Sequence, residues 1–102
     1  MKITRVQYTV KDEYVETNKK NIEAVMQALK NMNIKDLKYS TCLMEDGKSF
    51  MHLAFAETPE ANDQLTNLPE FKFFTSELRA KGIIAPPVTE HPTLVAAGYD
   101  IF

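Results

Sequence analysis

The dipeptide Asp46-Gly47 is the feature that most constrains the fold, because it separates two stretches of alternating side chains, residues 37–45 and 48–56. An Asp-Gly pair in this setting is the strongest short-range signal for a β-hairpin, and its two-residue type I′ turn requires positive φ at both residues. A two-residue turn fixes the register of the two strands. The expected cross-strand pairs are Glu45 with Lys48, Leu43 with Phe50, Cys42 with Met51, Thr41 with His52 and Tyr39 with Ala54.

Changes in hydrophobic period predict the other elements. Residues 3–10 alternate as a strand does, and apolar side chains then recur at helical spacing between Asp12, a candidate N-cap, and Asn33, a candidate left-handed C-cap. Two further helix starts follow, each with proline at the first helical position. They are Thr58-Pro59-Glu60 and Asn67-Leu68-Pro69-Glu70, and the second begins a helix anchored by Phe71, Phe73, Phe74 and Leu78 that ends at Gly82.

The last part of the chain predicts a fourth strand. Pro86 and Pro87 forbid a helix and disfavour a central strand, so residues 85–92 are expected to form an extended connection. Residues 93–102, TLVAAGYDIF, are expected to form the strand itself. The resulting order, β-α-β-β-α-β, predicts a single α+β domain over residues 1–102, with the ferredoxin-like fold: one antiparallel four-stranded sheet with both helices on one face.

The hairpin register divides the side chains of the sheet between two faces that are both rather apolar. We expect one face to pack beneath the helices and the other to meet a second copy of the chain, because a large apolar patch in contact with water usually marks an interface. The face expected beneath the helices carries Cys42, Met44, Met51, Leu53 and Phe55, and the face expected at the partner carries Tyr39, Thr41, Leu43, Phe50, His52 and Ala54. The pattern therefore predicts a homodimer in which two sheets form a barrel.

Composition excludes several classes of protein. The formal net charge is −2 and the basic residues are scattered, whereas a nucleic-acid-binding face requires clustered lysine and arginine. No stretch approaches the roughly 18 apolar residues of a membrane span. The opening residues, MKITRVQYTV, alternate instead of forming an apolar run, and the single cysteine, Cys42, cannot form an internal disulfide and is expected to be a buried, inert thiol. We therefore expect a cytoplasmic protein.

The order of elements, the Asp-Gly hairpin and the segment LPEFKFFTSEL (residues 68–78) resemble the dimeric α/β-barrel superfamily, and within it the antibiotic-biosynthesis-monooxygenase-like proteins, in their uncharacterised branch. The resemblance implies a homodimer with a small-molecule cleft between sheet and helices, and activities such as cofactor-free oxygenation of aromatic compounds or isomerisation. The characterised monooxygenase and haem-degrading branches place tryptophan and asparagine in the cleft. This chain has no tryptophan, and Gln7 stands on the first strand where an asparagine is expected.

Three residues are candidates for catalysis. The imidazole of His52, on a rigid strand, is suited to acid–base chemistry, with Tyr39 diagonal to it as an orienting group; alternatively, His52 forms a hydrogen bond across the dimer. Asn18 lies on the apolar side of its helix, so its amide either bonds to nearby backbone or forms a polar point in the cleft.

The candidate ligand-binding residues are Tyr8, Thr41, Phe50 and Phe74. Tyr8 shares a strand face with Val6 and Val10, and is either a cleft residue or a core tyrosine with a bonded hydroxyl. His91 lies in the proline-rich connection and is expected to be an ordinary surface residue. The two histidines have no metal-ligand spacing and no phosphate-binding glycine loop is present, so we expect neither a metal nor a cofactor.

Three functions remain open on sequence alone. The first is a cofactor-independent monooxygenase-like or isomerase-like enzyme for a hydrophobic or aromatic small molecule. The second is a binding or sensing module that holds such a ligand without reaction. The third is a structural dimer whose interior is filled by Phe71, Phe73 and Phe74.

Overall fold

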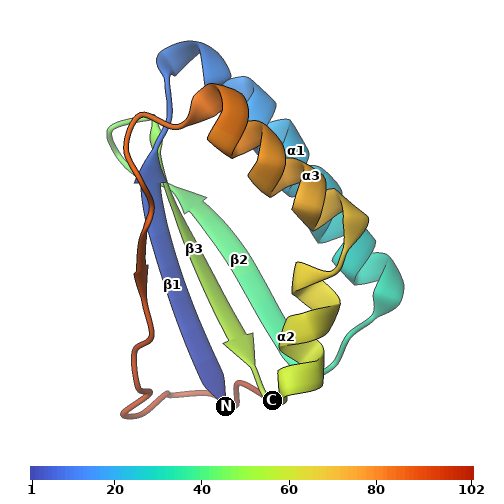
Figure 1. Cartoon of the computed structure of the whole chain (residues 1–102). Coiled ribbons are helices and arrows are strands. Elements are labelled where there is room, and N and C mark those ends of the chain that lie inside the picture. Colours follow the sequence, from blue (N-terminus) through green and yellow to red (C-terminus); the bar gives the residue numbers. More distant parts are fainter.

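The computed structural model describes residues 1–102 and has four strands on one side and three helices on the other (Figure 1). The strands are β1 (Lys2–Thr9), β2 (Leu37–Leu43), β3 (Ser49–Ala56) and β4 (Val88–Glu90), and the helices are α1 (Val15–Met32), α2 (Pro59–Thr66) and α3 (Pro69–Glu77). A 3-10 turn, Asp12–Tyr14, leads into α1, and a π-helical turn, Leu78–Gly82, continues α3. The antiparallel sheet has the order β2-β3-β1-β4, which confirms the predicted ferredoxin-like α+β fold.

The predicted hairpin register is confirmed, although the turn differs. Leu43 lies opposite Phe50 and Thr41 opposite His52 in the β2–β3 ladder. Gly47 has a φ of 76°, but Asp46 does not have positive φ, so the turn is not type I′. Instead the Asp46 carboxylate accepts hydrogen bonds from the backbone N–H groups of Lys48 and Ser49, at 2.9 and 2.8 Å, and stabilises a wider turn. The hydroxyl group of Ser49 also donates to this carboxylate, and that bond, together with the two backbone bonds, holds the pKa of the carboxyl below its usual value.

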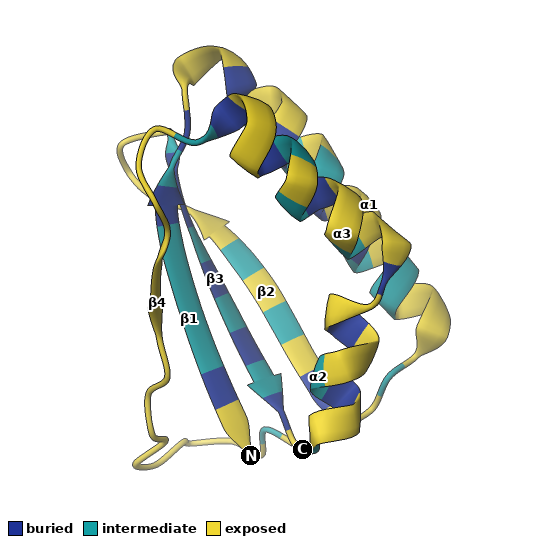
Figure 2. Ribbon diagram, in the orientation of Figure 1, coloured by how far each residue is buried: buried dark blue, intermediate teal, exposed yellow.

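The prediction of which sheet face lies beneath the helices is wrong. His52, Phe50 and Ala54 are buried under the helices, whereas Met51 and Leu53 on the opposite face are only half-buried, an alternation visible along β3 in Figure 2. Cys42 shares that opposite face and is exposed, so it is not the buried thiol expected from the sequence. The buried face is the more polar of the two, and its burial is tolerated because its polar groups are hydrogen-bonded to one another.

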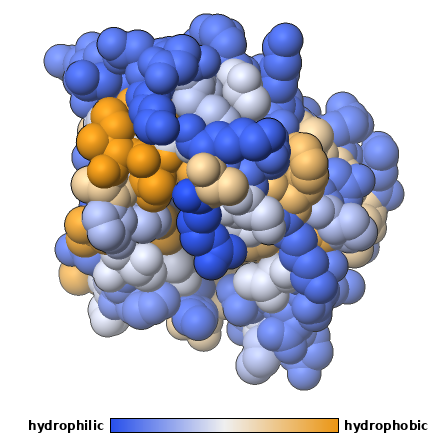
Figure 3. Space-filling view, turned by 45° about the horizontal axis from the view of Figure 1, so that its top comes forward, coloured by the Kyte–Doolittle hydropathy of each residue, from blue (hydrophilic) through white to orange (hydrophobic).

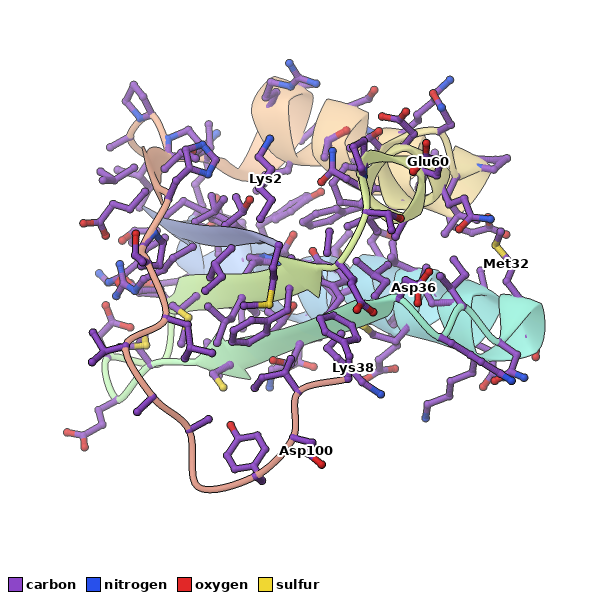
Figure 4. All side chains as sticks on the ribbon, turned by 90° about the horizontal axis from the view of Figure 1, so that it is seen from below. Lys2, Met32, Asp36, Lys38, Glu60 and Asp100 are labelled. Atoms are coloured by element: carbon purple, nitrogen blue, oxygen red, sulfur yellow. The ribbon has the colours of Figure 1, made fainter.

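The fourth strand is also displaced from its predicted position. Residues 93–102 have no regular secondary structure, and β4 is instead the short segment Val88–Glu90, which pairs with β1 directly after the two prolines. Proline disfavours only a central strand, and β4 lies at the sheet edge, where one side needs no partner. The remaining residues cross the side of the sheet away from the helices and end near Lys38 of β2 (Figures 1 and 4).

The helix ends largely follow the predicted signals. Asn33 adopts the left-handed conformation (φ 52°) that ends α1, and Pro59 and Pro69 begin α2 and α3. Asp12 does not act as an N-cap, because it lies inside the 3-10 turn and Lys11 precedes that turn without a side-chain cap. The face seen in Figure 3 is mostly hydrophilic, with one prominent hydrophobic patch and smaller apolar areas elsewhere. No helix combines the length and apolar character that crossing a lipid bilayer would require.

The side chain of Thr58 caps α2, and its removal is expected to weaken the fold measurably. Thr58 Oγ1 accepts a hydrogen bond from the backbone N–H of Ala61 at 3.2 Å. The Thr58→Ala substitution leaves that N–H without its partner and should reduce the free energy of unfolding by about 1 kcal/mol, as measured by urea denaturation. Thr66→Ala, at the other end of α2, is the matched control and should change it by less than about 0.5 kcal/mol. Equal effects of the two substitutions would contradict the capping role.

Candidate functional site

A cavity of about 440 Å³ lies between the inner face of the sheet and the helices α2 and α3. Its floor is formed by buried side chains of β1 and β3, among them Tyr8 and His52, and the buried Phe74 of α3 is part of its wall. The residues that line it are Thr4, Val6, Tyr8, Tyr39, His52, Ala54, Asn62, Leu65, Thr66, Phe71, Phe74, Thr75, Leu78, Arg79, Pro87 and Thr89. The volume is within the range of small-molecule sites, roughly 300–1,000 Å³.

The polar groups of the cavity floor form a row centred on His52. Tyr8 on β1 places its hydroxyl oxygen 2.7 Å from Nε2 of His52, and Tyr39 on β2 places its hydroxyl oxygen 2.6 Å from Nδ1. Thr41 Oγ1 also lies 2.9 Å from Nδ1, but Thr41, predicted to bind the ligand, does not line the cavity. The register produces this row, because Thr41 lies directly opposite His52 while Tyr8 and Tyr39 are diagonal neighbours on either side. Sequence reasoning therefore placed His52, Tyr39 and Thr41 correctly relative to one another.

Asn18 extends the row to the helical layer. Its side chain is completely buried on α1, and its Nδ2 donates a hydrogen bond of 3.0 Å to the hydroxyl oxygen of Tyr8. Asn18 thus contacts Tyr8 and not the cavity itself, and its Oδ1 has no hydrogen-bond partner. Of the two alternatives raised for Asn18, neither backbone bonding nor direct cleft lining is observed; the amide acts on the site through Tyr8.

Burial keeps all members of the row uncharged near neutral pH. Burial lowers the pKa of His52 to about 4, because the imidazolium form loses its hydration and no carboxylate compensates it. Burial likewise raises the pKa values of Tyr8 and Tyr39 above the usual value of a phenol, and the hydrogen bonds from Asn18 and Thr41 offset only part of that rise. At pH 7 the site is therefore a neutral imidazole between two neutral phenols.

The row accommodates two arrangements of its hydrogens without moving any heavy atom. In the first, Asn18 donates to Tyr8, Tyr8 donates to Nε2 of His52, and Nδ1 carries the ring hydrogen and donates toward Tyr39 and Thr41. In the second, Tyr39 donates to Nδ1, and Nε2 carries the hydrogen and donates to Tyr8. The hydroxyl hydrogen of Tyr39 is free to face the cavity in the first arrangement, and that of Tyr8 in the second.

The other residues singled out from the sequence divide into those near the cavity and those away from it. Phe74 lines the cavity, while Phe50 is buried behind Tyr8, with the two ring centroids 5.9 Å apart, and does not line it. Gln7 belongs to the outer face of the sheet and accepts a hydrogen bond from Arg5. His91 lies within 3.2 Å of the carbonyl oxygen of Ile3 and 3.4 Å from Thr4 Oγ1, and it does not itself line the cavity.

The interior is not filled by Phe71, Phe73 and Phe74, as the alternative of a structural dimer expected. Phe73 was expected to anchor its helix, but it is 57% exposed and points away from the space that it was expected to fill. Phe71 and Phe74 form walls of the cavity and leave it open between them and the sheet. The prediction of an interior without a cavity is therefore wrong.

Sequence reasoning missed Arg79, and a signal for it was available. Cavity-lining residues on the last helical segment recur as Phe71, Phe74, Thr75, Leu78 and Arg79, the i, i+3, i+4, i+7, i+8 pattern of one helix face. A cation in the same stripe as the core phenylalanines is unusual, because a helix face that packs only against a core is normally apolar. The chain contains no group of three or more His, Cys, Asp or Glu side chains placed to hold a metal ion.

The fold and the cavity define a ferredoxin-like α+β protein with a largely apolar cavity beneath its helices. Neither a family model nor a curated protein matches the sequence. Solved structures do match its fold. A candidate antibiotic biosynthesis monooxygenase from Bacteroides thetaiotaomicron matches with a TM-score of 0.82 at 9% identity, over 99% of this chain and 95% of that one. A candidate from Nitrosomonas europaea matches with a TM-score of 0.77 at 12% identity, over 94% and 100% of the two chains.

A third structure, of an antibiotic biosynthesis monooxygenase, matches with a TM-score of 0.78 at 11% identity, over 94% of this chain and 100% of that one. The resemblance to the antibiotic-biosynthesis-monooxygenase-like fold is thereby confirmed over nearly the whole chain. At such low identity the likeness is one of fold, and the chemistry has to be argued from the residues of this cavity.

Proposed function

We propose that this protein is an enzyme of the cofactor-independent, monooxygenase-like or isomerase-like kind, which moves a proton on a hydrophobic aromatic small molecule held in the cavity. The observation that supports this most directly is the row Tyr8–His52–Tyr39, with both imidazole nitrogens hydrogen-bonded to phenols that line the cavity. Positioned acid–base groups of this type accelerate proton transfer by about 10²–10⁴-fold.

The row can act as a neutral proton shuttle. In the first hydrogen arrangement, the free hydroxyl of Tyr39 gives its proton to a carbonyl oxygen of the substrate and takes the Nδ1 hydrogen of His52. Nε2 then takes the hydroxyl hydrogen of Tyr8, and Tyr8 takes a proton from the carbon next to that carbonyl. The substrate becomes an enol, and the imidazole never becomes charged, which suits a histidine whose pKa is about 4. Enolisation of this kind is common to the isomerase-like and the monooxygenase-like alternatives.

Hydrogen exchange of 2-tetralone, a neutral bicyclic ketone with acidic C–H bonds beside its carbonyl group, tests this proposal. In D₂O the protein should accelerate deuterium uptake at those carbons, followed by NMR. His52→Gln and Tyr39→Phe should each lower the catalysed rate by about 100-fold or more, because each breaks the shuttle. His91→Gln, at a histidine that does not line the cavity, is the control and should retain the rate. Uptake that is unchanged in both His52→Gln and Tyr39→Phe would refute the shuttle.

One observation favours a non-enzymatic binding module as the second candidate. Both nitrogens of His52 already have partners within the protein, so a ligand can be held by the cavity without using the imidazole. Binding of 2-tetralone, seen as a thermal shift, together with no accelerated deuterium uptake by the unmodified protein would establish this alternative.

We also propose that the working form is a homodimer, formed through the outer face of the sheet and not through the face first assigned to it. The outer face carries the half-buried apolar residues Met51, Leu53 and Phe55, and the exposed large apolar side chains include Met44 and Val95. Apolar surface of this extent favours association with a second copy. Sedimentation equilibrium at micromolar concentration tests this point, and a stable monomer would contradict it.

A further inference from the structure

Arg79 is the one charged residue that lines the cavity. The remaining polar side chains of the lining are neutral at pH 7, since they are threonines, tyrosines, an asparagine and the uncharged His52. No aspartate or glutamate faces the space. The cavity therefore combines an apolar interior with a single positive charge, and that charge has no counter-charge within the site.

The guanidinium group of Arg79 is also largely free of protein partners. Its single hydrogen bond runs from Nε to the carbonyl oxygen of Thr75, at 3.4 Å. The three ion pairs of the chain involve other cations: Arg5, Lys19 and Lys81. The nearest acid along the helix, Glu77, is occupied by Lys81 at 3.1 Å. Both terminal nitrogens of Arg79 are thus available as a planar pair of donors, the geometry that matches a carboxylate.

Arg79 lies at the mouth of the cavity, opposite the buried row. The exposed members of the lining are Arg79, Thr66, Pro87 and Thr89, whereas Tyr8, His52 and Phe74 are almost completely buried. The opening is therefore between the end of the α3 segment and β4. A molecule that enters with its aromatic part inward would leave a substituent on its outer end beside the guanidinium.

We infer that the ligand of this cavity is an aromatic acid, with its ring system against Phe74 and the Tyr8–His52–Tyr39 row and its carboxylate paired with Arg79. The inference deepens the proposed function, on which it rests, by giving the substrate class. Arg79 is the specificity-determining residue, because it distinguishes an anion from a neutral molecule of the same shape. The enclosed row performs the proton transfer at the other end of the ligand.

The test compares 2-naphthoate with 2-naphthamide, which has nearly the same shape and no charge. The chain contains no tryptophan, so naphthalene fluorescence can be excited with little protein background. The unmodified protein should bind 2-naphthoate about tenfold more tightly than 2-naphthamide, and 0.5 M NaCl should reduce that preference, because the pair at the mouth is screened by salt. Arg79→Gln should abolish the preference by weakening naphthoate alone.

Two further variants complete the test. Arg79→Lys should restore part of the preference, since it retains the charge and loses the planar fork. Lys72→Gln removes an exposed charge of α3 that does not line the cavity, and it should leave both affinities unchanged. Equal binding of the two probes by the unmodified protein, or a preference that persists in Arg79→Gln, would overturn the inference and leave the proposed function standing. If neither probe binds, the proposed hydrophobic small-molecule function fails together with the inference.

Discussion

The Gly82→Ala substitution is expected to lower the free energy of unfolding by about 3 kcal/mol, because the added methyl group would overlap the ring of Tyr14. A Cβ atom at Gly82 would lie 2.5 Å from Cε2 and 2.6 Å from Cγ of that ring. The ring cannot easily move aside, since Tyr14 is 6% exposed and belongs to the main core cluster. The backbone at Gly82 is equally fixed, as its carbonyl oxygen accepts a hydrogen bond from Lys11 at 2.9 Å.

The effect of this substitution would be measured by urea denaturation at pH 7 and compared with that of Gly98→Ala. No atom lies within 4 Å of a Cβ atom built on Gly98, and φ is not positive there, so the control should change stability by less than about 0.5 kcal/mol. If Gly82→Ala were as mild as the control, the close packing of the 3-10 turn against the end of the α3 segment would be incorrect.

The second large effect is a loss of stability on mild acidification that depends on His52. In the folded protein burial lowers the pKa of His52 to about 4, whereas the unfolded chain has an ordinary histidine near 6.5. Between these values the unfolded state binds a proton and the folded state does not, so the stabilisation is complete above pH 6.5 and is lost as the pH falls toward 4. The full difference is about 3 kcal/mol, of which about 2 kcal/mol disappears between pH 7 and pH 5.

This pH effect is measured as the difference between variants, which removes the contribution of the carboxylates. Between pH 7 and pH 5, the free energy of unfolding should fall by about 2 kcal/mol more in the unmodified protein than in His52→Gln. His91→Gln, which replaces an exposed histidine, should retain the behaviour of the unmodified protein. The same pH dependence in the unmodified protein and in His52→Gln would show that His52 is not buried in its neutral form.

The sequence predicted which residues of the site lie opposite one another in the sheet, but it did not predict which face of the sheet is buried. The Asp46-Gly47 turn aligned Thr41 with His52 correctly even though the type of turn was wrong, because the predicted narrow turn and the observed wider turn are both centred between Asp46 and Gly47. The choice of buried face was wrong, because hydropathy treats tyrosine, threonine and histidine as polar when they are considered singly. Their mutual hydrogen bonds, which make burial favourable, appear only when three strands are placed side by side.

Two other features could not be predicted fully, because they also depend on contacts between segments that are far apart in the sequence. Residues 93–102 have the composition of a strand, yet β4 formed at Val88–Glu90, where the chain pairs again with β1 after its first contact through Ile84 and Thr9. Asn18 was recognised as anomalous from its helical position, and its burial confirms the anomaly. Its partner Tyr8 was not predictable, because the contact depends on how α1 packs across the sheet.

The row of polar groups runs across β1, β3 and β2, at right angles to the course of the chain, and this has a consequence for how an active molecule arises. Neighbouring side chains of a strand point to opposite faces, so a slip of one residue in any of the three strands would carry its member of the row to the outside. Misaligned forms would therefore be inert as well as less stable. A molecule therefore gains its proposed activity only when its strands are correctly aligned. Recovery of the 2-tetralone exchange after refolding would then report directly on the fraction of molecules with the correct alignment.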